Sequence, residues 1–110
     1  MIHVIATIEL APGTRDAYLA EFRKLVPLVH NEVGVAEYGP AVDEPSGLAA
    51  QELAGEDTVI VIEKWTSVAA LKRHAAAPHM AEFRTRVKDF VKRVSLHVLR
   101  PVASADTSGM

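Results

Sequence analysis

The sequence contains no cysteine, which excludes disulfides, thiolate metal sites and a thiol nucleophile. Its six glycines are scattered, so neither a GxGxxG segment nor a phosphate-binding loop occurs, and we expect no nucleotide, nicotinamide or flavin cofactor. No apolar run approaches the roughly 18 residues that a membrane-spanning helix needs. The net charge of −2 lacks the basic surplus that is typical of nucleic-acid binding. We therefore expect a cytoplasmic protein with neither membrane nor nucleic-acid partners.

The proportions of hydrophobic and charged residues are typical of a folded globular protein. Hydrophobic residues make up 49% of the 110 residues and charged residues 24%. That length suits one domain. We expect residues 1–102 to form this domain and residues 103–110 to form a flexible C-terminal tail.

Hydrophobic periodicity predicts an α+β domain. Alternating apolar residues or β-branched runs predict strands at 2–10, 35–42, 58–65 and 94–102, with a further short strand at 48–53. Apolar residues at helical spacing predict helices at 14–32, 67–76 and 79–92. We expect Val68 and Leu71 to face inward in the second of these helices. The resulting order matches the split β-α-β layout of ferredoxin-like domains, with helices on one face of an antiparallel sheet.

Such a sheet has a second face that no helix covers. In the strand at 58–65 this face carries either Ile60 and Ile62 or Val59 and Val61, and both sets are apolar. At roughly 25 cal/mol per Å², leaving such a face in water costs several kcal/mol. We therefore expect a homodimer that forms through the sheet face.

Glu63 and Trp65 alternate on one face of the strongest strand, the face that also carries Val59 and Val61. A carboxylate that continues an apolar face must be paired, hydrogen-bonded or protonated. Glu63 is either a pocket residue that partners a histidine or a strand-end residue bridged to Lys64, Arg73 or water. The Trp65 indole suits an aromatic ligand, although packing alone explains a lone tryptophan more simply.

His74 and His79 flank Pro78, which interrupts the helical pattern. Histidine titrates near neutrality, so either residue suits the removal of a proton from a phenol. A spacing of five residues across a proline is not a helical metal-ligand pair, and we expect no metal site. Tyr38 either donates to a ligand or anchors an edge strand, and we expect Glu32 to be solvated at a helix end.

Several short motifs, in this order and spacing, resemble the antibiotic biosynthesis monooxygenase family and most closely its quinol monooxygenase branch. The resemblance covers about residues 2–101, and the motifs that carry it are Pro12-Gly13, Lys24-Leu25-Val26-Pro27, Glu32-x-Gly34, Tyr38, Ala41-Val42-Asp43, Glu63-x-Trp65, Ala70, His74 and Ala77-Pro78-His79-Met80.

The resemblance implies a homodimeric α+β barrel with a pocket in each subunit. It also implies oxygenation of a quinol or polycyclic aromatic substrate by O2 without metal, flavin or haem. By analogy, His74 or His79 is the base and Glu63 supports it. The residues expected to contact the substrate are Trp65, Tyr38 and Phe83.

Two other functions stay open. A cofactor-free isomerase of a small phosphorylated metabolite would need a basic group in the pocket, which Arg73 or Arg84 could supply. A non-enzymatic binder of apolar aromatic ligands would use Trp65 as its platform. Haem degradation is disfavoured, since the first strand carries Thr7 where the haem-degrading relatives have asparagine.

Overall fold

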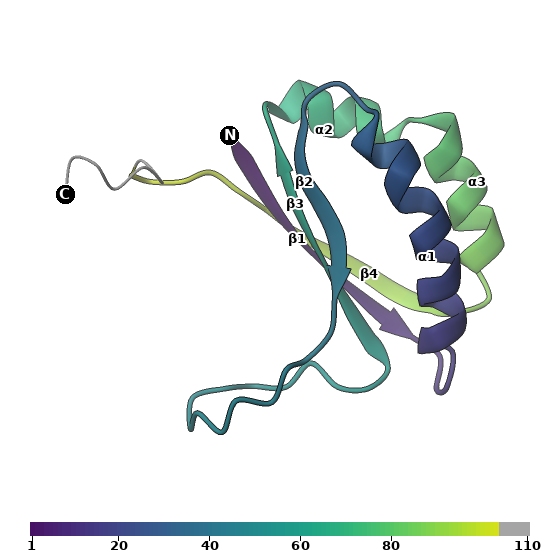
Figure 1. Cartoon of the computed structure of the whole chain (residues 1–110), viewed down its shortest axis with the longest axis vertical. Helices are drawn as coiled ribbons and strands as arrows, with labels where there is room; N and C mark the ends of the chain where they lie inside the picture. The colour runs from purple at the N-terminus through teal and green to yellow at the C-terminus, as the bar shows by residue number, and fades with distance from the viewer. Residues whose placement is uncertain (104–110) are drawn as a thin grey trace.

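Four strands form one antiparallel sheet, and three helices lie on one side of it (Figure 1). The structure is a computed structural model that describes residues 1–103. In chain order the elements are β1 (Ile2–Leu10), α1 (Arg15–His30), β2 (Val35–Ala41), β3 (Thr58–Trp65), α2 (Val68–Ala75), α3 (Pro78–Val87) and β4 (Val91–Leu99). Of the expected tail at 103–110, residues 104–110 lie outside the described residues.

The strand order across the sheet is β2-β3-β1-β4, and every neighbouring pair is antiparallel. This is the ferredoxin-like arrangement that the sequence predicts, with β2 and β4 at the edges. Between residues 1 and 103 the structure holds no helix of the length and apolar character needed to cross a bilayer.

The two faces of the sheet have different surroundings. On β1, alternate residues from Val4 to Leu10 are buried beneath the helices, and on β3 Val59 and Val61 lie on the same side. The opposite face carries Ile60 and Ile62, with Ile5 directly across from Ile62. The sequence left open whether the isoleucines or the valines of β3 lie on the face that no helix covers, and the structure places the isoleucines there. Ile62 is 37% exposed.

An aromatic layer joins α1 to the strands and to α3. The Phe22 ring of α1 stacks at 5.5 Å on Tyr38 of β2 and meets Phe83 of α3 edge-on at 5.6 Å. The Tyr18 ring, one turn earlier on α1, meets Phe83 at 5.7 Å. Because these rings interlock, the positions of α1, β2 and α3 are fixed relative to one another.

The expected strand at 48–53 is wrong. Residues 42–57 form a long connection that extends away from the body of the sheet (Figure 1). The Gln51 side chain bonds the backbone N–H of Ser46 and the carbonyl of Glu44, while Asp43 accepts from the backbone N–H groups of Ala54 and Gly55. These side-chain bonds to the backbone take the place of strand pairing.

Two expectations about the helices also need correction. The last helix ends at Val87 and not at residue 92, because Val91 already pairs with Leu10 of β1, so β4 covers 91–99 and not 94–102. In α2, Val68 is exposed and Leu71 is only partly buried, whereas Ala70 and His74 are buried. The inward face of α2 thus carries a histidine.

Candidate active site

The break between α2 and α3 places a histidine on each side of it. His74 is in the last turn of α2, and His79 directly follows Pro78, the first residue of α3. Proline is favoured in the first turn of a helix but has no N–H with which to continue the preceding one. Ala77 donates its backbone N–H to the His74 carbonyl at 3.1 Å, which closes the connection.

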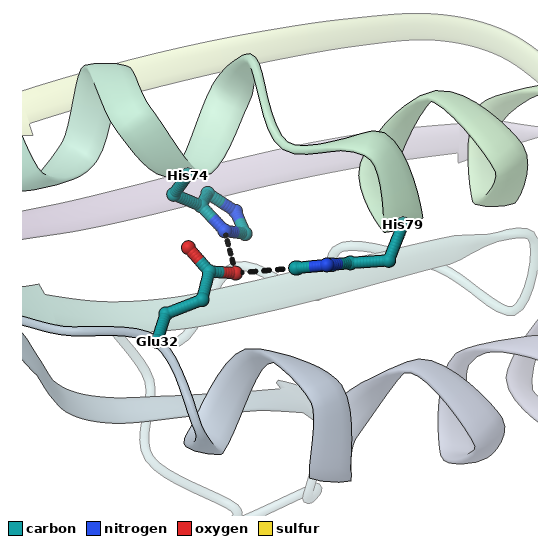
Figure 2. A group of neighbouring side chains, drawn as sticks. All are labelled: Glu32, His74 and His79. Atoms are coloured by element: carbon teal, nitrogen blue, oxygen red, sulfur yellow. Dashed lines mark hydrogen bonds and ion pairs between the residues drawn. The ribbon is translucent and has the colours of Figure 1, made fainter.

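Both histidines bond one carboxylate oxygen of Glu32, just beyond α1 (Figure 2). The His74 Nδ1 atom lies 2.9 Å from Glu32 Oε2, and the His79 Nε2 atom lies 2.7 Å from the same oxygen. The Glu32 side chain is only 13% exposed. The expectation of a solvated Glu32 is therefore wrong, and this residue is the one that sequence reasoning missed. The signal that could have found it is the Glu32-x-Gly34 motif.

This geometry fixes the proton positions on the neutral imidazoles. A carboxylate oxygen only accepts hydrogen bonds, so His74 must carry its proton on Nδ1 and His79 on Nε2. The Nε2 atom of His74 is then unprotonated, and it makes no hydrogen bond to any residue from 1 to 103. An imidazole held by a carboxylate on one nitrogen and free on the other is the arrangement of a general base.

Glu63 pairs with Trp65 and not with a histidine. Trp65 Nε1 donates to Glu63 Oε1 at 2.9 Å. Burial, the larger influence, raises the pKa of Glu63, and the bond from Trp65 and the nearby His74 oppose this rise. Lys64 contacts Glu37 at 3.8 Å, so the Glu63–Lys64 bridge that the sequence left open does not form. Glu63 is thus a buried carboxyl that holds its proton more readily than an exposed one.

The Trp65 indole lies behind His74. Its ring is 0% exposed and lies 4.6 Å from the His74 imidazole, tilted by 35°. The Tyr38 ring meets the same imidazole edge-on at 5.2 Å. In this position Trp65 packs behind His74 and does not line the cavity beside that residue, so its expected contact with a substrate has no support from the structure. The simpler packing interpretation describes it.

A cavity of about 450 Å³ lies beside His74. Its wall includes four of the expected site residues, Tyr38, Glu63, His74 and Phe83, whereas Trp65 and His79 do not line it. Most of the remaining wall is aliphatic and comes from β1, β4 and α3. The volume falls within the range of small-molecule sites, and an apolar wall with a few polar groups is their usual composition.

Two phenol hydroxyls also belong to this wall. Tyr18 and Tyr38 line the cavity, and neither hydroxyl bonds a residue of the described chain. Since no fully buried side-chain polar atom in residues 1–103 lacks a partner, these hydroxyls reach open space in the cavity. Burial, as the main cause, raises the pKa of both tyrosines, so at neutral pH both are hydrogen-bond donors.

The same three residues that form the hydrogen-bonded cluster could also ligate a metal. Glu32, His74 and His79 each offer one ligand atom, and these atoms lie within 4.8 Å of one another. Two imidazoles and a carboxylate suit a divalent transition ion. Such an ion would have to replace the two protons that now lie between the histidines and Glu32. The distances of 2.7 and 2.9 Å are those of N–H···O bonds.

The fold and the site define an α+β ferredoxin-like domain with a histidine beside an apolar cavity, and solved structures of other proteins share this fold. The crystal structure of PA3566 from Pseudomonas aeruginosa matches with a TM-score of 0.75 and 28% identity, covering 93% of this chain and 94% of that one. The structure of Rv0793 from Mycobacterium tuberculosis matches in fold with a TM-score of 0.75 at 24% identity, covering 96% and 98%.

The sequence comparisons identify the family. The model of the antibiotic biosynthesis monooxygenase family matches residues 1–86. The protein called probable quinol monooxygenase YgiN of Escherichia coli is 39% identical over 103 residues, which cover 92% of this chain and 98% of that protein. The chain therefore belongs to the antibiotic biosynthesis monooxygenase family, as its motifs indicate.

Proposed function

We propose that this protein is a cofactor-free monooxygenase that oxidises a quinol with O2. The observation that carries the proposal is His74, which lines an apolar cavity while Glu32 holds its Nδ1 proton. The name of the YgiN relative supports a quinol as the substrate. A quinol is an electron-rich substrate whose hydroxyl proton a positioned histidine can remove, and an apolar cavity of this size accepts its ring.

The chemistry needs only a base, a dry site and O2. His74 Nε2 removes a proton from a quinol hydroxyl, and the resulting anion passes one electron to O2. The semiquinone and superoxide radicals combine at a ring carbon to give a hydroperoxide. Loss of water, with return of the proton, leaves a hydroxyquinone. Quinol and O2 thus give hydroxyquinone and one water, with one oxygen atom retained on the ring and no external reductant.

The other polar groups of the cavity position the substrate. The hydroxyls of Tyr18 and Tyr38 donate to its oxygens, and the edge of Phe83 bounds its ring. Glu32 orients His74 and stabilises the imidazolium that forms when the proton arrives, as a carboxylate does for a general base. His79 donates to the same oxygen and so fixes Glu32. The proposed roles are a base for His74 and positioning for Glu32 and His79, in place of the support by Glu63 that the resemblance implied.

The test is oxygen consumption by protein stripped of metal with EDTA and given 1,4-dihydroxynaphthalene. We expect uptake above the spontaneous rate, and one labelled oxygen in the product under ¹⁸O2. Added Zn²⁺ is expected to inhibit, because it would occupy the nitrogens of His74 and His79.

Each other result has a distinct meaning. No stimulation above the spontaneous rate would exclude the oxygenase, and activity that returns only with a metal would exclude the cofactor-free mechanism. Rearrangement of a phosphorylated substrate without oxygen uptake would favour the isomerase. Tight binding of aromatics without turnover would favour the non-enzymatic binder.

We also propose that the protein acts as a homodimer through its uncovered sheet face. Ile5, Ile60 and Ile62 lie on that face, and burying them against a second copy removes apolar surface from water. The expected mass in sedimentation equilibrium is twice 11.9 kDa. A single-chain mass at micromolar concentration would contradict the dimer.

A further inference from the structure

Two basic side chains belong to the wall of an otherwise apolar cavity. Arg84 and Lys88 both line it, and both are exposed residues at the C-terminal end of α3 and just beyond it. They are four positions apart, so they lie on the same side of the helix. Being exposed, they mark the mouth of the cavity, whereas His74, Tyr38 and Glu63 are buried deeper in the wall.

Arg84 is held across the connection between α2 and α3. Its Nη2 atom donates to the backbone carbonyl of Ala75, the last residue of α2, at 3.2 Å. Ala75 also lines the cavity. This bond uses one of the five donors of the guanidinium and leaves the others for a ligand.

Neither cation is neutralised within the described chain. No carboxylate of residues 1–103 lies within ion-pair distance of Arg84 or Lys88, whereas Arg86 on the same helix pairs with Glu21 at 3.0 Å. Of the described carboxylates only Glu63 lines the cavity, and neither Glu63 nor Glu32 pairs with these cations. Glu63 is bonded to the Trp65 indole, and Glu32 is engaged by both histidines. The exposed Asp89 follows Lys88 in the chain but does not line the cavity.

We propose that Arg84 and Lys88 select a substrate that carries an anionic substituent, namely an aromatic acid whose ring enters the cavity while its carboxylate stays at the mouth. This rests on the proposed function and narrows its substrate class to acidic quinols. The apolar wall accepts the ring, and the two cations supply charge-assisted hydrogen bonds to the carboxylate. Arg73, the other basic candidate from the sequence, does not line the cavity.

The test compares two ligands that differ by one carboxylate, 6-hydroxy-2-naphthoate and 2-naphthol, by calorimetric titration at low salt. We expect the acid to bind about five- to tenfold more tightly, the effect of two partly exposed ion pairs. The preference should shrink in high salt and disappear in the variant Arg84→Gln/Lys88→Gln. The matched control is Lys72→Gln/Arg73→Gln, which also removes two positive charges from exposed helix positions and should keep the preference.

Equal affinity for the two ligands, or an unchanged preference in the double variant, would overturn the inference. A phosphorylated sugar that binds more tightly than the aromatic acid would overturn it in favour of the isomerase. The inference and the proposed function fail separately. Turnover of 1,4-dihydroxynaphthalene without any preference for the acid leaves the oxygenase and removes the inference. Preferential binding of the acid without oxygen uptake removes the oxygenase and leaves the recognition of an aromatic acid by Arg84 and Lys88.

Discussion

Replacing His74 with glutamine is expected to lower the kcat of oxygen-dependent quinol turnover by about 10²–10⁴-fold, the usual contribution of a general base. Glutamine fills similar space, so the fold is retained, but its amide cannot accept a proton at neutral pH. What is lost is the free nitrogen beside the cavity. The measurement is initial oxygen uptake at saturating 1,4-dihydroxynaphthalene, corrected for spontaneous oxidation.

A pH series separates the loss of a base from a general disturbance. A phenol of this kind ionises near pH 10, by analogy with tyrosine. As the pH rises toward that value, the substrate loses its proton to solvent, so the difference between His74→Gln and the wild type should shrink. A constant difference at all pH values would contradict the role of His74 as a base.

Variants of His79 are the matched comparison. His79→Gln keeps a donor for Glu32 and should be close to the wild type, whereas His79→Ala removes it and should be slower. Both should remain well above His74→Gln, because only His74 lines the cavity. If His79→Ala lost as much activity as His74→Gln, the assignment of the two histidines would be wrong.

The core elements of the fold could be predicted because their signals are local. The alternation along β1 and the β-branched run of β3 specify strands, and the apolar stripe of α1 specifies a helix. The end of α3 could not be predicted in this way. Phe90 and Val91 continue the helical spacing, but the backbone carbonyl of Phe90 accepts from Ala11 and Val91 pairs with Leu10. Pairing of Val91 with a residue 81 positions earlier in the chain, which no local pattern contains, determines this boundary.

In the candidate site, too, some residues could be predicted from local sequence and others could not. The flanking proline places His74 and His79 on two helices, and the sequence is enough to select them. Their common partner is 42 and 47 positions away from them in the chain, so no spacing links Glu32 to either. Glu63 is nearer to the histidines in sequence and was therefore their more obvious partner, but it accepts a hydrogen bond from Trp65 instead. Which carboxylate a histidine meets depends on the path of α1 across the sheet.

Replacing Gly34 with alanine is expected to destabilise the protein by roughly 2–5 kcal/mol, because two costs add. The backbone at Gly34 has a φ of +93°, which side chains rarely adopt. A Cβ atom there would lie 2.6 Å from the Cβ of Ala70 and 2.8 Å from Oγ1 of Thr66, both closer than atoms can pack. In a thermal unfolding experiment this corresponds to a fall in Tm of at least about 10 °C.

The same substitution should also weaken the site below the unfolding temperature. Gly34 accepts the Thr66 backbone N–H at 2.8 Å, which ties the segment carrying Glu32 to the start of α2, the helix that carries His74. A displaced Gly34 therefore moves Glu32 relative to His74. The expected result is a lower kcat at 15 °C, where the variant is folded.

Gly13→Ala separates the two costs, since Gly13 has a φ of +78° but no atom within 4 Å of its Cβ position. It should lose only the backbone cost of roughly 1–2 kcal/mol and keep its activity. A second control removes the closest obstacle: Ala70→Gly, despite the roughly 1 kcal/mol that glycine costs in a helix, should recover part of the stability that Gly34→Ala loses. If Gly34→Ala and Gly13→Ala lost the same stability and Ala70→Gly recovered none, contact with α2 would not be what requires glycine at position 34. The link between that contact and the placement of Glu32 would then fail with it.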